Sequence, residues 1–137
     1  MLTGTHRFPR QDLVTHGRPA AEAVRELAAT WGARRILVTT TRSLAEGLAA
    51  EFAAGLGGLC AGVFRDIGAH SPREGVVAGA NEARRVDADL LVALGGGSVI
   101  DATKVMQLCL WAGLTEVAQL DPYRAGRGAD RVDMATV

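Results

Sequence analysis

The residues best suited to chemistry in this sequence form one run, Gly95-Gly96-Gly97-Ser98-Val99-Ile100-Asp101-Ala102-Thr103-Lys104, directly after an apolar segment at 90–94. Glycines let a backbone approach an anion closely. The free N–H groups and partial positive charge at the start of a helix then hold that anion. Lys104 is the single lysine in a chain that has fourteen arginines. The run therefore predicts a phosphate cradle, and the unusual lysine favours a functional role for its helix.

Other known glycine-rich motifs and a simple turn explain this run less well. The spacing is not the G-x-G-x-x-G fingerprint, whose third glycine would fall on Ile100, and the Gly-Lys-Ser/Thr of a P-loop is missing. A plain strand-to-helix turn would need only a capping serine, with Ser98 and Asp101 as a capping box. Three consecutive glycines exceed that need, because each one costs backbone entropy. Lys104 either lies in solvent or points towards the ligand.

A second polar segment, Thr39-Thr40-Thr41-Arg42, follows the apolar run 36–38. In dinucleotide sites an acidic residue at this kind of position holds the ribose 2′-OH, whereas an arginine accommodates a 2′-phosphate. The segment has no acid and does have Arg42. A polar strand end before the next helix explains the segment equally well, so both interpretations stay open.

The remaining reactive side chains suggest no catalytic centre. The three histidines, His6, His16 and His70, lack metal-ligand spacing, although His70 falls near a predicted sheet edge. Cys60 and Cys109 lie in apolar runs, which predicts buried free thiols rather than a disulfide. We therefore predict no catalytic residue and no metal ligand in this sequence.

Composition narrows the class of protein. Fifteen basic residues balance fifteen acidic ones across 137 residues, which gives no electrostatic case for nucleic acid or an anionic membrane. The sequence shows neither an apolar stretch of about 20 residues nor a signal-peptide pattern. We expect a cytoplasmic protein whose partner is a small molecule.

The alternation of elements predicts the fold. Helices are expected at 19–31, 44–54, 72–85 and 98–111, and short apolar strands at 36–39, around 63–64 and at 90–94. This order predicts an α/β fold, a parallel sheet with helices on both faces. Ligands bind such sheets at the carboxyl ends of the strands, so the loops 39–42, 68–71 and 95–98 should line one crevice. Three serines are each followed three residues later by an acid, which predicts capping boxes at Ser43, Ser71 and Ser98.

The chain divides in two by composition. Residues 1–113 are predicted to form the α/β nucleotide-binding domain. Residues 114–137 are predicted to be a linker or tail, because the sequence from Asp121 onwards is polar and contains glycines.

The pattern G-G-G-S-x-x-D-x-x-K after a Leu/Val strand resembles the iron-containing alcohol dehydrogenase family, including its maleylacetate reductase branch. Segments 14–18, 35–40 and 70–72 also resemble that family, so the likeness covers about residues 10–111. It implies a Rossmann-like domain of the dehydroquinate synthase-like type. It also implies a set of cofactor-binding residues: Gly95, Gly96, Gly97, Ser98, Asp101, Lys104, Thr39, Thr40 and Ser71.

The resemblance further implies an activity. The cofactor would be NAD or NADP; Thr40 stands where many members carry the Asp that holds the adenosine ribose, which leaves NADP or dual use open. The enzyme would interconvert an alcohol and a carbonyl, or reduce maleylacetate. Members of the family continue into a helical domain that binds iron or another divalent metal, which polarises the substrate.

The sequence ends in the linker before that helical domain. We therefore expect this chain to be catalytically incomplete, and to be a homo-oligomer or the partner of a C-terminal half. The alternative is a non-catalytic nucleotide-binding or protein-interaction module, because a fold does not by itself imply a function.

Overall fold

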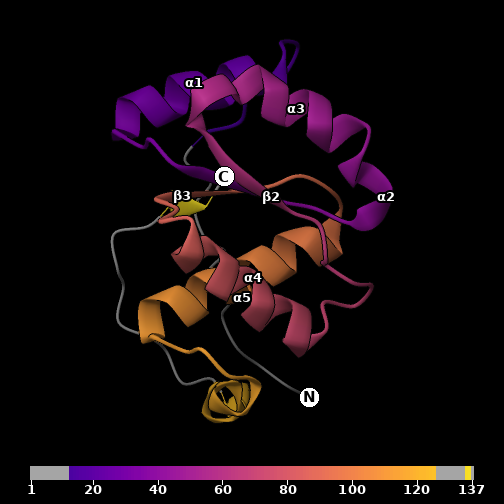
Figure 1. The fold of residues 1–137 in the computed structure, drawn as a ribbon, viewed down its shortest axis with the longest axis vertical. Coiled ribbons are helices and arrows are strands. Elements are labelled where there is room, and N and C mark those ends of the chain that lie inside the picture. The colour runs from indigo at the N-terminus through magenta and orange to yellow at the C-terminus, as the bar shows by residue number, and fades with distance from the viewer. Residues whose placement is uncertain (1–12, 126–134, 137) are drawn as a thin grey trace, which may run out of the picture.

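The computed structural model describes residues 13–125 and 135–136 (Figure 1). The α-helices are α1 Ala20–Trp31, α2 Arg42–Ala45, α3 Leu48–Leu56, α4 Arg73–Arg85 and α5 Gly97–Ala112. The 3₁₀ helices are η1 Gly57–Leu59 and η2 Val117–Ala125, and the strands are β1 Ile36–Thr39, β2 Cys60–Phe64, β3 Leu90–Ala93 and β4 Ala135–Thr136.

The strands form one parallel sheet in the order β2-β1-β3-β4. Thr39 at the end of β1 lies opposite Phe64 of β2 and Ala93 of β3. The three longer strands therefore end at the same level, and the loops that follow them share one edge. The predicted α/β fold with a parallel sheet is confirmed.

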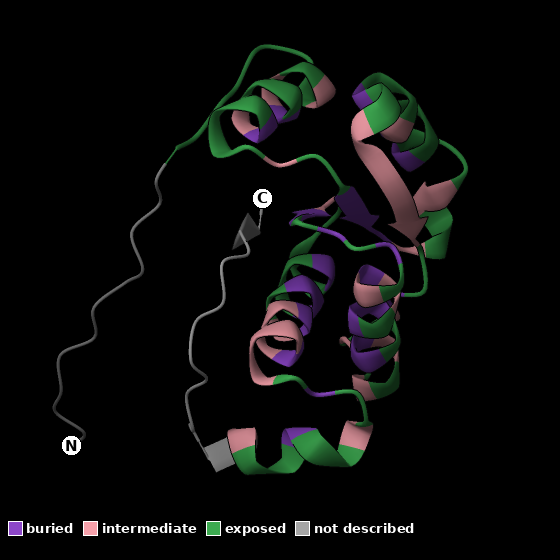
Figure 2. Ribbon diagram, turned by 60° about the vertical axis from the view of Figure 1, so that its left-hand side comes forward, coloured by how far each residue is buried: buried purple, intermediate pink, exposed green. Residues whose placement is uncertain are grey.

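Helices cover both faces of the sheet, as Figure 1 shows: α1 and α3 lie on one face, and α4 and α5 on the other. Successive side chains of a strand point to opposite faces. Ile36 and Val38 accordingly belong to the core cluster with Phe52 of α3, while Leu37 belongs to the cluster with Met106 of α5. Figure 2 shows β1 and β3 buried between helices whose outer faces are exposed. A strand buried on both sides needs apolar residues at every position, which explains the near-continuous apolar runs.

Three of the four predicted helices are found with nearly the predicted boundaries, and the fourth is not. Helices α1 and α5 end at Gly32 and Gly113, both in the left-handed conformation, as glycine past a helix end predicts. The continuous helix predicted over 44–54 is wrong, because Gly47 separates α2 from α3. Glycine in a helix interior costs about 1 kcal/mol relative to alanine, and here the chain breaks at that point.

The three predicted capping boxes are wrong. Helices α2, α4 and α5 begin after Thr41, Pro72 and Gly96, and none of these N-caps makes a side-chain hydrogen bond to its helix. The hydroxyl of Ser43 instead pairs with that of Thr41, and the hydroxyl of Ser71 donates to the carbonyl of Ser98. For Ser71, a partner that is distant in sequence replaces the local cap.

The segment after α5 is more ordered than the sequence predicts. Residues 121–125, predicted as loop, continue the 3₁₀ helix η2. Leu120 of this helix is 5% exposed and belongs to the core cluster of α4 and α5. An ion pair of 2.9 Å between Arg73 Nη1 and Asp121 Oδ1 ties η2 to α4.

Two predictions are not tested by this structure. The domain boundary proposed at residue 113 stays a prediction, and His6 lies outside the described residues. No helix within 13–125 is long and apolar enough to cross a bilayer.

Both cysteines are free, as predicted; Cys109 is fully buried, whereas Cys60, also predicted to be buried, is only half-buried. Burial raises the pKa of the Cys109 thiol above its ordinary value of 9.0. Because the folded state disfavours the thiolate, this group contributes stability below pH 9 that is lost as the pH rises above 9. We expect the free energy of unfolding from urea melts to fall more steeply above pH 9 in the wild type than in Cys109→Ala. The same dependence of the free energy of unfolding on pH in the two proteins would contradict this prediction.

Candidate functional site

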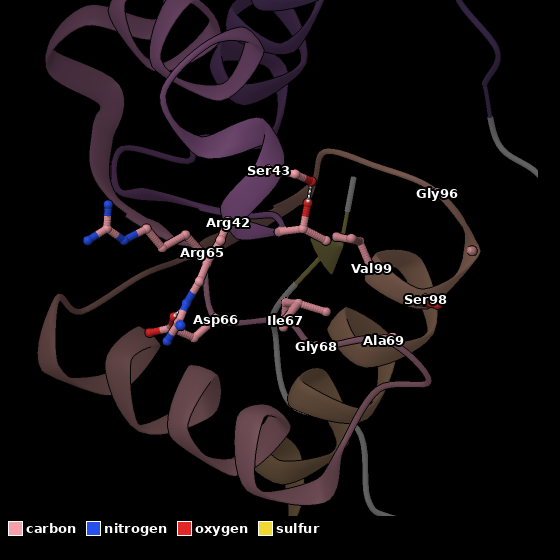
Figure 3. Close-up of a pocket in the computed structure, with 12 residues that line it drawn as sticks. Arg42, Ser43, Arg65, Asp66, Ile67, Gly68, Ala69, Gly96, Ser98 and Val99 are labelled. Carbon is pink, nitrogen blue, oxygen red and sulfur yellow. Dashed lines mark hydrogen bonds and ion pairs between the residues drawn. The ribbon is translucent and has the colours of Figure 1, made fainter.

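A crevice of about 650 Å³ opens at the carboxyl edge of the sheet (Figure 3). It is lined by residues from the loops after β1, β2 and β3: Thr41, Arg42, Ser43, Arg65, Asp66, Ile67, Gly68, Ala69, Gly96, Gly97, Ser98 and Val99. The sequence predicted that these three loops line one crevice, and the structure brings them together.

Gly95 makes the turn from β3 into the loop. Its φ is +156°, and a Cβ built on it would lie 2.7 Å from Cγ2 of Val99. Cβ atoms in proteins essentially never lie this close to an atom of a non-neighbouring residue. The fold itself therefore requires glycine at position 95.

Gly96 and Gly97 are different. Neither has a positive φ, and a Cβ built on either would meet nothing within 4 Å. Neither backbone conformation nor packing against other residues therefore explains why positions 96 and 97 are glycine. Both are exposed at the mouth of the crevice, where a side chain would occupy space that is now open.

The start of α5 presents unpaired backbone donors to this open space. The first hydrogen-bonded N–H groups of the helix are those of Val99 and Ile100, which donate to the carbonyl of Gly96 at 3.0 and 3.2 Å. The N–H groups of Gly97 and Ser98 find no acceptor among the described residues. Unpaired N–H groups at a helix start carry partial positive charge and bind anions. The arrangement can hold a phosphate or pyrophosphate.

Two hydroxyl groups fix the glycine loop, defined as residues 94–98, at its two ends. Thr40 Oγ1 donates to the carbonyl of Leu94 at 2.8 Å. Ser71 Oγ donates to the carbonyl of Ser98 at 2.7 Å, from a residue with φ +51°. Both ends of the loop are thereby tied to residues of other loops.

A buried pair of threonines supports the loop from below. Thr39 Oγ1 lies 2.6 Å from Thr103 Oγ1, which donates to the carbonyl of Val99 at 2.7 Å. Thr39, Thr40 and Thr103 are all 0% exposed. The sequence predicted Thr39 and Thr40 as cofactor-binding residues; the structure places their side chains beneath the crevice, with their hydroxyls used within the protein.

This buried pair gives a stability prediction. Thr103→Val keeps the shape of the side chain but removes the hydroxyl that meets Thr39, whose remaining acceptor is the carbonyl of Val92 at 3.4 Å. A buried hydroxyl that loses its partner costs about 1–3 kcal/mol. We expect urea denaturation to show a loss of this size, and an unchanged free energy of unfolding would contradict the network.

The other predicted residues do not line the crevice. Asp101 lines a smaller cavity of about 270 Å³ together with Ser71, Arg73 and Tyr123. Lys104 is exposed and lines neither cavity. His70 is exposed, in the left-handed conformation, beside the crevice residue Ala69.

Two charged residues of the crevice, Arg65 and Asp66, were not predicted from the sequence. They follow β2 directly, so their position at a strand's carboxyl end was the available signal. Asp66 Oδ1 accepts a hydrogen bond of 2.6 Å from Nε of Arg42, whose side chain is 81% exposed. Figure 3 shows Arg42, Arg65 and Asp66 on one side of the crevice, and Gly96 and Ser98 on the other.

A metal does not fit the described residues. Within 13–125 and 135–136, no group of three His, Cys, Asp or Glu side chains lies close enough together to hold a metal ion. We therefore assign no metal ligand to these residues.

Comparison with known proteins gives consistent matches. The family model described as iron-containing alcohol dehydrogenase matches residues 12–134. Maleylacetate reductase 2 of Cupriavidus pinatubonensis is 39% identical over 95 residues, which are 69% of this chain and 26% of that protein. The crystal structure of maleylacetate reductase from Agrobacterium tumefaciens matches with a TM-score of 0.60 and 33% identity, over 72% of this chain and 30% of that one.

A more distant structure matches the fold more completely. Sulfoacetaldehyde reductase from Bifidobacterium kashiwanohense, solved in complex with NAD+, has a TM-score of 0.74 at 22% identity, over 88% of this chain and 31% of that one. The chain thus spans about a quarter of the length of the curated relatives it matches.

Proposed function

The chain belongs to the iron-containing alcohol dehydrogenase family, and we propose that it forms the part of the enzyme that binds NAD or NADP. The observation that carries this proposal is the open space above Gly96 and Gly97, faced by the free N–H groups at the start of α5. This open space gives an anion room beside these donors. A dinucleotide pyrophosphate carries that charge, and the rest of the crevice has room for one end of the cofactor.

The residues take distinct parts in this proposal. The N–H groups of Gly97 and Ser98 hold the pyrophosphate, and Gly95 makes the turn that presents them. Thr40 and Ser71 act through the glycine loop, by fixing its two ends. Asp101 and Lys104 stay predictions from the family resemblance, because neither lines the crevice.

The whole enzyme's reaction is proposed from its relatives. A bound nicotinamide supplies hydride chemistry, and the relatives named above include maleylacetate reductases. We propose a whole enzyme that interconverts an alcohol and a carbonyl, or reduces maleylacetate. This chain's own contribution is to bind and orient the cofactor. We further propose that the 137-residue chain alone binds the cofactor without turning over substrate.

Isothermal titration calorimetry with NAD+, NADH, NADP+ and NADPH tests the proposal. We expect saturable binding of one dinucleotide per chain for at least one of the four. Circular dichroism on the same sample should show a folded α/β protein. A folded chain that binds none of them would overturn the proposal, and alcohol oxidation by the isolated chain would overturn the claim that it only binds.

A further inference from the structure

We propose that the crevice contains a subsite for the 2′-phosphate of the cofactor's adenosine ribose, centred on Arg42, so that the chain prefers NADP to NAD. This inference rests on the proposed function, and it deepens it by choosing between the two cofactors. Three observations support it: the position of the end of β1 in the sheet, the hydrogen bond that orients Arg42, and the net charge of the residues that line the crevice.

The sheet order places the end of β1 where the ribose should lie. β1 is the direct neighbour of β3, whose glycine loop is proposed to hold the pyrophosphate. In dinucleotide sites the ribose lies at the end of such a neighbouring strand, where an acid binds its 2′-OH or an arginine accommodates a 2′-phosphate. Thr41, Arg42 and Ser43 after β1 line the same crevice as Gly96 and Gly97. The position thus offers an arginine and no acid.

Arg42 is held so that its binding face stays free. Its Nε donates to Asp66 Oδ1 at 2.6 Å, while its two Nη groups have no partner among the described residues. The guanidinium is planar, so a bond at Nε orients the Nη groups as well. Paired N–H groups of this kind bind phosphate oxygens in a bidentate manner. Asp66 therefore acts as a positioning residue for Arg42.

The charges of the crevice favour a dianion over a neutral hydroxyl. Its charged lining residues, among those described, are Arg42, Arg65 and Asp66, which sum to one net positive charge. The single carboxylate is already paired with Arg42. The hydroxyls of Thr41 and Ser43 are hydrogen-bonded to each other at 2.9 Å, so one of them keeps a neutral O–H donor beside Arg42. A site built for an unphosphorylated ribose would instead present a free carboxylate to the 2′-OH.

Calorimetric titration of the 137-residue chain with NADP+ and NAD+ tests the subsite. We expect NADP+ to bind about 10-fold more tightly or better, as a charge-assisted bidentate contact implies. Arg42→Gln should bring the two affinities within about 3-fold, chiefly by weakening the binding of NADP+. NADP+ affinity alone should also rise between pH 5 and pH 7, because a phosphate monoester takes its second charge at a pKa of about 6.

Arg85→Gln is the matched control. Arg85 is 70% exposed and pairs with Glu82 at 2.6 Å, much as Arg42 pairs with Asp66, but it lies on α4 and does not line the crevice. The Arg85→Gln substitution removes the same charge from the chain, and it should leave the ratio of the NADP+ and NAD+ affinities unchanged. Circular dichroism confirms that each variant is folded.

Four outcomes would overturn the inference. Equal affinity for NAD+ and NADP+, or an equal loss of both in Arg42→Gln, would remove the subsite while the proposed function stands. An equal change of ratio in Arg85→Gln would show a general charge effect instead of a site. Binding of neither dinucleotide would overturn both the inference and the proposed function.

Discussion

Gly96→Val should abolish dinucleotide binding while the domain stays folded. The valine side chain would project into the open space above the start of α5, where a Cβ meets no protein atom within 4 Å. That space is where we place the pyrophosphate, so the branched side chain and the ligand would compete for it. We expect a loss of affinity of about 100-fold or more, which corresponds to about 2.7 kcal/mol of binding free energy.

The stability of this variant should change little. Gly96 is the N-cap of α5, with φ −85° and ψ −168°, a conformation that every L-residue adopts. Exchanging glycine for an apolar residue at an N-cap costs about 1 kcal/mol or less. Calorimetry measures the binding and urea denaturation measures the free energy of unfolding on the same preparation.

Gly58→Val is the matched control for the steric argument. Gly58 also has a negative φ and open space around its Cβ position, but it lies in η1, away from the crevice. It should bind the cofactor as the wild type does. Wild-type affinity in Gly96→Val would show that the glycine loop is not the phosphate cradle. If Gly96→Val is unfolded, Gly96→Ala provides a smaller side chain for the same comparison.

The fold was predictable because its signal is repeated along the chain. Three short apolar runs alternate with segments of helical period, and a parallel sheet between two layers of helices buries the central strands on both sides. The break at Gly47 was not predicted, although glycine is a known helix breaker. An isolated glycine inside a helical pattern is often tolerated at a cost of about 1 kcal/mol, so its presence alone does not predict a break.

The glycine loop was predictable for a related reason. Three consecutive glycines are costly, so a local signal of that strength points to a specific backbone need. The sequence did not separate the need of Gly95, which is internal, from that of Gly96, which we assign to the ligand. That distinction depends on Val99 being folded back against the turn.

The supporting contacts could not be predicted, because their partners are distant in sequence. Ser71 precedes an acid by three residues and so resembles a cap, yet its hydroxyl donates to a carbonyl 27 residues away. Thr39 resembles a ligand-facing strand end, yet it pairs with Thr103 across 64 residues. A hydroxyl group bonds to whichever acceptor the tertiary fold brings to it, and the sequence does not state which.

Gly95→Ala should have the opposite profile to Gly96→Val: a loss of stability that accompanies any loss of binding. A Cβ at this position would lie 2.7 Å from Val99 Cγ2 and 3.2 Å from Val99 Cβ, in a residue whose φ is +156°. Val99 is 2% exposed and packed in the core cluster of α4 and α5, so it has little room to move. Overpacking of this kind typically costs about 1–3 kcal/mol, which urea denaturation would measure.

A double-mutant cycle with Val99→Ala identifies the cause of that loss. Val99→Ala removes both methyl groups of the valine, including Cγ2, the nearest atom to the added Cβ. If the clash is the main cost, Gly95→Ala should destabilise the Val99→Ala background clearly less than it destabilises the wild type, with a coupling of about 1 kcal/mol or more. Additive losses would mean that the backbone conformation, and not the contact with Val99, requires glycine. In either case position 95 would differ from position 96 in its free energy of unfolding, because the fold needs only the first of these two glycines.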